Sequence, residues 1–242
     1  MSPPTQTQLI EQLAQGEISV TGQFMWGSNY TFFCDVSYQA KTIPAVYKPV
    51  RGERPLWDFP SESLGGREVA AYLVSEGGGW GMVPPTILRE DGPAGPGSLQ
   101  MYVEHDPEYH FFKFSEEDKA RTRPVALFDA VANNTDRKAG HVLVGEDGHL
   151  WLIDHGVCFH AQPKLRTVIW DFAGLPLTEG ERTQLTGLQE KLALDTDLYS
   201  SLTPYLSRRE IVAISGRIDT LLAEGKFPYP SEEWPSMPWP PV

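Results

Sequence analysis

The chain has 242 residues, 40% of them hydrophobic, and carries a formal net charge of -12 at pH 7. This length and apolar content suffice for one large core or for two lobes with a cleft between them, and they exclude wholesale disorder. The negative charge argues against nonspecific nucleic-acid binding and against electrostatic docking on anionic membranes. A chain of this charge that handles an anionic substrate has to gather its cations locally or recruit metal ions.

The two cysteines and the hydropathy pattern indicate the compartment. Cys34 and Cys158 have no C-x-x-C spacing, so they predict reduced thiols and neither a disulfide framework nor a zinc site. The opening MSPPTQTQLIEQL lacks the basic and apolar parts of a signal peptide, and no stretch approaches the ~20 apolar residues of a membrane span. We therefore expect a soluble, cytoplasmic protein that is not an integral membrane protein.

The first half of the chain predicts strands with two helices. Thr5 is a suitable cap for a helix that ends near Gly16. GGREVAAYLVS, residues 65–75, has helical periodicity, and the Pro- and Arg-rich residues 51–63 are typical of a loop. Runs rich in Val, Phe, Tyr and Thr predict strands at residues 17–26, 30–38, 43–47, 83–88 and 98–103.

The second half predicts helices and one hairpin. A helix is expected to start at Ser115 and to continue past Pro124 to about Ala132. Thr178 with Glu181, and Ser207 with Glu210, have the spacing of capping boxes and precede helical runs. A compact hairpin is expected at residues 141–144 and 150–153. The Pro- and Trp-rich tail after Phe227 predicts an extended strap or a segment that docks a partner.

Small residues and a lysine in the first half could contact phosphate. The turn Gly27, Ser28 and Asn29 could direct backbone N–H groups at phosphate oxygens, although an ordinary tight turn has the same composition. Lys48 ends a strand-like run, where it could be a point cation inside a cleft or a solvated strand end.

A carboxylate on the next helix could hold that lysine in place. Glu68 is the first candidate for pairing with Lys48, and Glu76 is the second if the register differs. A surface helix glutamate is the alternative interpretation of either residue.

The run NNTDRKAGH lies between an apolar helix and the hairpin, and it has no packing reason to be polar. Asp136 could accept the proton of an attacking hydroxyl. Arg137, followed by Lys138, could neutralise Asp136 or a transferred phosphate. Such a concentration of charge is more typical of a catalytic loop than of a solvated connection.

The second strand of the hairpin delivers Asp154 at the edge of a buried element, followed by Gly156. A hard, anionic oxygen donor in that place suits Mg²⁺. Together, a phosphate-facing turn, a strand lysine, a helix carboxylate, a loop carboxylate and a metal-binding carboxylate are the parts that ATP-dependent phosphoryl transfer needs. The order predicts a kinase that uses ATP and Mg²⁺, with Mn²⁺ as the other metal.

NNTDRKAGHVLV and WLIDHG resemble the catalytic loop and the metal-binding segment of phosphatidylinositol 3- and 4-kinases, the type II 4-kinases above all. VYKPV resembles their ATP-lysine strand and GREVAAYLVS their orienting helix. Related loops occur in HipA-type toxin kinases and secretory-pathway kinases. Over residues 17–228 the chain is most similar to an uncharacterised actinobacterial-type family of phosphatidylinositol-kinase-related proteins.

The resemblance implies an α+β, two-lobed protein-kinase-like fold, with a β-rich N-lobe at 1–104, a helical C-lobe at 105–228 and a tail at 229–242. It implies that backbone groups of Tyr102 and Val103 bond adenine, that Asp136 is catalytic and that Asp154 binds metal. The relatives carry an Asn where this chain has His141, a second metal position. Imidazole suits Mn²⁺ or Zn²⁺ better than Mg²⁺, so His141 could bind a different metal, contact phosphate or mark a lost activity.

The acceptor and the activity stay open at this level. Lys164 and Arg166 could bind an anionic acceptor, and a small molecule or a protein fits this acidic chain better than a lipid. The alternatives to a kinase are a nucleotide-binding pseudokinase that recruits a partner through its tail, and a kinase-like enzyme that transfers AMP.

Overall fold

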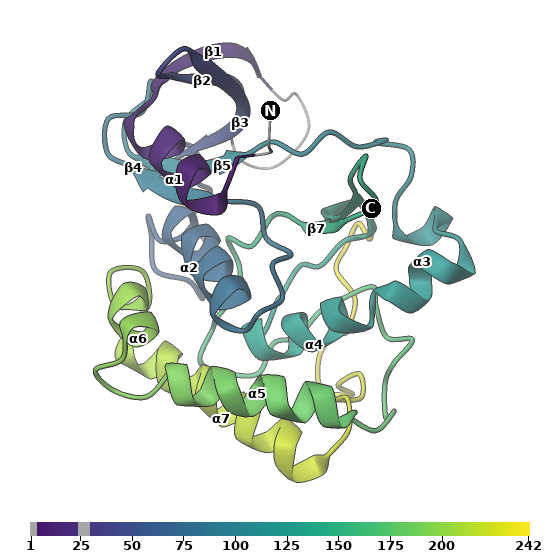
Figure 1. Ribbon diagram of the computed structural model, residues 1–242. Coiled ribbons are helices and arrows are strands. Elements are labelled where there is room, and N and C mark those ends of the chain that lie inside the picture. Colours follow the sequence, from purple (N-terminus) through teal and green to yellow (C-terminus); the bar gives the residue numbers. More distant parts are fainter. Residues whose placement is uncertain (1–3, 24–29) are drawn as a thin grey trace.

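A computed structural model describes residues 4–23 and 30–242. It has the expected protein-kinase-like fold, with an antiparallel sheet in the N-terminal part and helices in the C-terminal part (Figure 1). The helices are α1 (Gln6–Gln15), α2 (Leu64–Gly77), α3 (Glu116–Arg121), α4 (Arg123–Ala132), α5 (Glu179–Lys191), α6 (Asp197–Leu202) and α7 (Arg208–Glu224). The strands are β1 (Glu17–Gln23), β2 (Phe32–Tyr38), β3 (Lys41–Pro49), β4 (Thr86–Arg89), β5 (Gly97–Met101), β6 (Val142–Val144) and β7 (Leu150–Leu152).

The N-terminal sheet has the strand order β1-β2-β3-β5-β4, with every neighbouring pair antiparallel. Successive side chains of a strand point to opposite faces, and β3 uses both faces. Ala45 and Tyr47 are fully buried in the small core beneath α1. Val46 and Lys48 point the other way and line a cavity. The alternation along β3 therefore directs Lys48 into the interior of the molecule.

Helix α2 joins the two parts of the fold. It contacts β4 and β5 on one side and α4 and α6 on the other, and nearly all of its residues are buried. Arg67, which is 1% exposed, donates to the carbonyl of Cys158 at 2.7 Å and to Glu210 Oε1 at 2.5 Å. Because Glu210 also closes the capping box of α7, this ion pair fixes α2 against the helical part.

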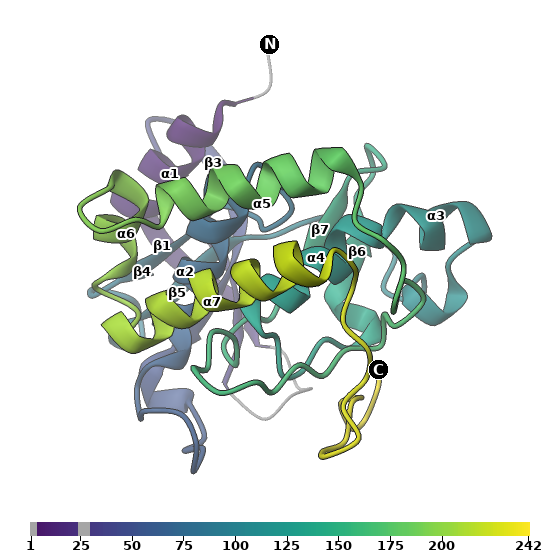
Figure 2. The same ribbon diagram turned by 90° about the horizontal axis from the view of Figure 1, so that it is seen from below.

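The larger core lies among α2, α4, α5, α7 and the β6–β7 hairpin. Helices α5 and α7 lie side by side over α4 (Figure 2). Both begin with the expected capping boxes, at Thr178 and at Ser207. Within the described residues, no helix is long and apolar enough to cross a membrane. Cys34 and Cys158 are buried free thiols, as expected.

The helix expected from Ser115 to Ala132 is divided in two. Ser115 caps α3, which ends at Arg121, and α4 begins at Arg123 with Pro124 in its first turn. Proline has no N–H to donate to the preceding turn and its ring clashes there, so it starts a new helix more easily than it continues an old one. The prediction of one continuous helix was therefore wrong at Thr122.

The tail is extended, and it packs back on the C-terminal part. Pro241 O accepts from Ala139 N at 2.8 Å, and Ser236 O accepts from Thr167 N at 3.1 Å. Figure 1 shows the yellow segment running from the end of α7 to the side of the β6–β7 hairpin. Since Ala139 lies within the predicted catalytic loop, the tail supports the predicted active centre from outside.

Candidate active site

Three side chains from distant parts of the sequence meet in one cavity. Lys48 Nζ lies 2.6 Å from Glu68 Oε1 and 3.0 Å from Asp154 Oδ1. Glu68 Oε2 also accepts the His155 backbone N–H at 2.9 Å. Strand β3, helix α2 and the segment after β7 thus hold one cation between two carboxylates. Glu68, the first of the two candidate carboxylates, is the partner of Lys48.

The charges of this group reinforce one another. Burial alone would lower the pKa of Lys48, but the carboxylates of Asp154 and Glu68 outweigh it and raise that pKa well above its ordinary value. Lys48 in turn holds the pKa of Asp154 far below its usual range, against the effect of burial. At neutral pH Lys48 is therefore a cation and Asp154 an anion, and this pair suits binding of phosphate and metal together.

Asp136 stands at the mouth of the same cavity. Its carboxylate lies 3.6 Å from Lys138 Nζ, and its backbone N–H donates to Asn134 Oδ1 at 2.9 Å. Burial, with a contribution from Asp154, raises the pKa of Asp136 to about 6, although Lys138 and Arg166 oppose the rise. A carboxylate with a pKa near neutrality can take a proton from an alcohol during a reaction.

His141 contacts Asp154 directly, with Nε2 at 3.3 Å from Asp154 Oδ2. Burial lowers the pKa of His141 to about 4, so the ring is neutral at pH 7. Its Nδ1 accepts from the Lys138 backbone N–H at 3.4 Å, which leaves the ring proton on Nε2. As placed, the neutral His141 ring has its Nε2 beside Asp154, and the role of His141 as a metal ligand stays a prediction.

Arg137 lies away from the cavity, contrary to the expectation that it neutralises a phosphate. Its guanidinium is fully buried, 3.0 Å from Asp129 Oδ1. It also donates to the carbonyl oxygens of His141 and Ile153, at 3.1 and 2.9 Å. The correction is that Arg137 braces the loop from behind, because a side chain with no exposed surface cannot contact a substrate.

The two asparagines before Thr135 also have structural tasks. Asn133 ends α4 with a left-handed backbone (φ 51°), and its side chain donates to the carbonyls of His160 and Gln162. Asn134 Nδ2 donates to Asp129 Oδ1 at 3.1 Å. The loop is therefore tied both to α4 and to residues 160–166, the segment that follows the metal position.

The structure describes only some of the other residues that were predicted to contact the nucleotide. Tyr102 N–H donates to Pro44 O at 3.0 Å, and Val103 O lies 2.7 Å from His105 Nδ1. Two of the four backbone groups at the predicted adenine position are thus engaged within the protein. Both residues line the cavity of Lys48. The turn Gly27, Ser28 and Asn29 lies outside the described residues.

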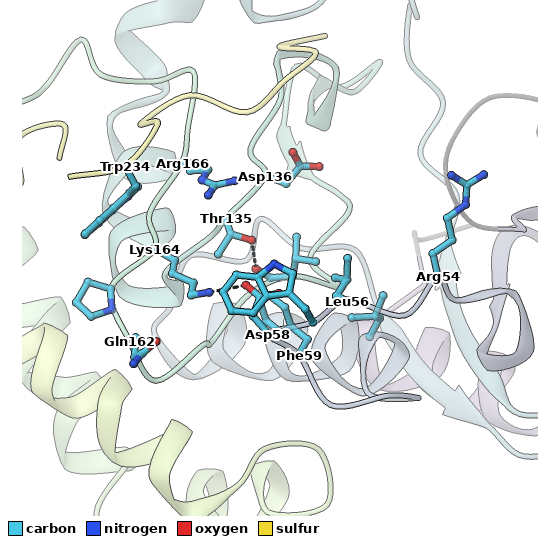
Figure 3. A pocket seen from close by; sticks show the side chains of 14 residues that line it. Arg54, Leu56, Asp58, Phe59, Thr135, Asp136, Gln162, Lys164, Arg166 and Trp234 are labelled. Carbon is cyan, nitrogen blue, oxygen red and sulfur yellow. Dashed lines mark hydrogen bonds and ion pairs between the residues drawn. The ribbon is translucent and has the colours of Figure 1, made fainter. Parts of the chain in front are cut away.

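Two cavities meet at Asp136. The first, of about 360 Å³, contains Lys48, Glu68, Tyr102, Val103 and Asp154; we call it the cleft. The second, of about 790 Å³, is lined by residues 54–59, 162–166 and Trp234; we call it the side cavity (Figure 3). Asp136, Leu64 and Val157 line both. A group bound in one cavity could therefore reach a group bound in the other at Asp136.

A divalent cation fits this donor set only together with phosphate. Asp154 is half-exposed and lines the cleft. In the part of the chain that the structure describes, no group of three or more His, Cys, Asp or Glu side chains could hold a metal. Mg²⁺ is commonly held by one or two carboxylates, water and substrate phosphates, so Asp154 suits a cation that arrives with a nucleotide.

Three residues that build or line the candidate site were not indicated by sequence patterns. Asp129, the partner of Arg137, is an acid inside the apolar helix ALFDAVA, and that contrast is the signal that could have found it. Trp57 and Trp234 line the side cavity from opposite ends of the sequence, where no local pattern relates them.

Comparisons with known proteins bear on the fold and on the family. A solved structure of the Helicobacter pylori proinflammatory kinase CtkA superposes with a TM-score of 0.50 over 89% of this chain and 94% of that one, at 13% identity. That likeness shows the fold, which is protein-kinase-like. No family model matches the chain.

A relative found by sequence similarity identifies the family. The chain is 38% identical to Protein Rv2133c of Mycobacterium tuberculosis over 94% of its own length and 93% of the relative, and it belongs to the same family. It is also 34% identical to Phosphatidylinositol 4-kinase gamma 4 of Oryza sativa subsp. japonica over 38% of this chain and 20% of that one.

Proposed function

We propose that this chain is a metal-dependent ATP phosphotransferase of the phosphatidylinositol-kinase-like type. The observation that carries the proposal is Lys48 held between Glu68 and Asp154, in a cleft that opens at Asp136 into a second cavity. This is the arrangement that phosphoryl transfer requires: a cation for the nucleotide phosphates, a carboxylate for the metal and a carboxylate beside the acceptor. The partial match to a phosphatidylinositol 4-kinase supports the type.

Each residue of the cleft has a task in this proposal. Lys48 binds α- and β-phosphate oxygens and Glu68 orients it. Asp154 holds a divalent cation, which neutralises charge on the phosphates when bound. Tyr102 and Val103, which line the cleft, face adenine.

The transfer itself takes place where the two cavities meet. An alcohol oxygen of the acceptor forms a bond to the γ-phosphorus while the bond from that phosphorus to the bridging oxygen of ADP breaks. The alcohol proton passes to the Asp136 carboxylate. Lys138, 3.6 Å from Asp136, keeps that carboxylate available as a base by lowering its pKa.

The test is ATP turnover by the purified chain with Mg²⁺ or Mn²⁺, together with intact-mass measurement of the protein and of added acceptors. We expect ADP release by the wild type and its loss in Asp136→Asn. Arg209→Gln, a charge change on the exposed start of α7, is the matched control. An adduct with the mass of AMP would replace the kinase by an AMP transferase, and turnover that Asp136→Asn leaves intact would refute the assignment of the base.

His141 favours a second candidate, a nucleotide-binding pseudokinase. Its Nε2 lies 3.3 Å from Asp154 Oδ2, at the position where the related kinases have an Asn metal ligand. If this contact blocks the metal, the wild type binds ATP without turnover and His141→Asn gains turnover with Mg²⁺. If the wild type already turns over ATP, the pseudokinase is excluded.

A further inference from the structure

We infer that the side cavity binds a small, free, anionic polyol or sugar, with its anionic group on Arg166 and a hydroxyl at Asp136. The inference rests on the proposed phosphotransfer and identifies the class of its acceptor. It is carried by the cavity that shares Asp136 with the cleft.

Arg166 lines the side cavity with a cationic side chain that has no anionic partner among the described residues. Within residues 4–23 and 30–242 its side chain makes no hydrogen bond or ion pair, and its buried Nε has no partner. The positive charge of Arg166 lowers the pKa of Asp136, but Asp136 forms its ion pair with Lys138. A guanidinium that has no anionic partner can form a charge-assisted contact, so this site favours a ligand that supplies a carboxylate or phosphate oxygen.

Lys164, the other predicted anion-binding residue, is already occupied. Its Nζ forms an ion pair with Asp58 and lies 4.7 Å from the centre of the Trp57 ring. Figure 3 shows Lys164 turned toward Asp58, whereas Arg166 lies beside Asp136. The two cations therefore differ: Lys164 closes the wall of the cavity, and Arg166 is available to a ligand.

The aromatic side chains that line the side cavity indicate the chemistry of the uncharged part of the ligand. Trp57 comes from the loop before α2 and is 93% exposed, and Trp234 comes from the tail, where its Nε1 lies 3.5 Å from Leu165 O. Phe59 adds a third aromatic ring. Aromatic faces pack well on the C–H faces of a ring, and a cavity of about 790 Å³ is in the range of small-molecule sites. A polyol or sugar supplies both the C–H faces and the acceptor hydroxyl.

The test measures binding by calorimetry with the full chain, Mg²⁺ and a non-hydrolysable ATP analogue. The probes are two matched pairs: inositol 1-phosphate against inositol, and glucose 6-phosphate against glucose. We expect a phosphorylated member to bind roughly 10- to 100-fold more tightly than its neutral partner, as for one charge-assisted contact. Arg166→Gln should abolish this preference, Arg166→Lys should restore part of it, and Arg209→Gln should leave it unchanged.

Trp234→Leu gives an independent readout, because it should weaken the phosphorylated and neutral probes by the same factor. The inference is overturned if neither phosphorylated probe is preferred, or if Arg166→Gln retains the preference. It is also overturned if ADP release responds only to phosphatidylinositol vesicles or only to peptides. Nucleotide affinity and its dependence on Lys48 are measured in the same samples, so a failure of the proposed function is seen separately.

Discussion

The guanidinium of Arg137 and the carboxylate of Asp129 form an ion pair 3.0 Å long with no exposed surface on either side chain. Through the same guanidinium, the carbonyls before and after the β6–β7 hairpin, at His141 and Ile153, are fixed to α4. The relative position of Asp136 and Asp154 thus depends on a pair that contacts neither cavity.

The first prediction concerns that pair. Arg137→Met should lower the free energy of unfolding by about 3–5 kcal/mol, because it leaves the Asp129 charge buried and unpaired. Denaturant unfolding measures the loss. Arg121→Met, which breaks the more exposed pair with Asp118, should cost at most about 1 kcal/mol. Equal effects of the two substitutions would show that Asp129 and Arg137 are not a structural pair.

The second prediction separates Glu68 from Glu76 on one helix. Glu68→Gln removes the charge that holds Lys48 and should lower kcat/KM for ATP by about 10- to 100-fold. Glu76 lies about 12 Å further along α2, from the rise of 1.5 Å per residue, and does not line the cleft. Glu76→Gln should therefore leave kcat/KM unchanged, and the reverse order would move the orienting carboxylate to Glu76.

The third prediction is a pH dependence of turnover. Asp136, with its pKa raised to about 6, must be deprotonated to accept a proton. The rate should therefore fall as the pH drops through about 6 and level off above it. Lys138 lowers this pKa, so Lys138→Gln should move the acid limb to higher pH. An acid limb that stays in place in Lys138→Gln would mean that another group titrates.

The fourth prediction concerns the tail. Deleting residues 229–242 removes the acceptors of Ala139 N–H and Thr167 N–H. At about 1 kcal/mol for each of these two contacts and for each of the Trp234 and Trp170 indole bonds, the loss is about 4 kcal/mol, or a fall in Tm of roughly 8–16 °C. Trp239→Ala, at a side chain 89% exposed, should change Tm little. An unchanged Tm after deletion would favour the tail as a partner-binding segment.

Sequence reasoning reached the residues whose chemistry depends on order and register. Lys48 at the end of a strand and Glu68 one helix later could be paired in advance, because period-two and helical spacing fix their directions. The buried position of the Arg137 side chain could not be predicted, because a polar run is expected to be exposed to solvent unless its buried partner, here Asp129, is known. The side cavity was also beyond reach, because Trp57 and Trp234 are brought together only by the folded tail.

The interruption at Thr122 has a local cause that the sequence did contain. Pro124 allows either a kinked continuous helix or a new helix, and the choice falls to packing. Thr122 is buried and its hydroxyl donates to Lys119 O at 2.6 Å, which ends α3 there. The exact boundary therefore depends on this local hydrogen bond and on the burial of Thr122.

The central claim is that Lys48, Glu68 and Asp154 form an ATP and metal site. A crystal structure of the chain with Mg²⁺ and a non-hydrolysable ATP analogue tests it most directly. We predict the triphosphate within hydrogen-bond distance of Lys48 Nζ and a cation on Asp154, with the γ-phosphate turned toward Asp136. A nucleotide bound elsewhere, or one bound in the cleft with no metal at Asp154, would contradict the claim.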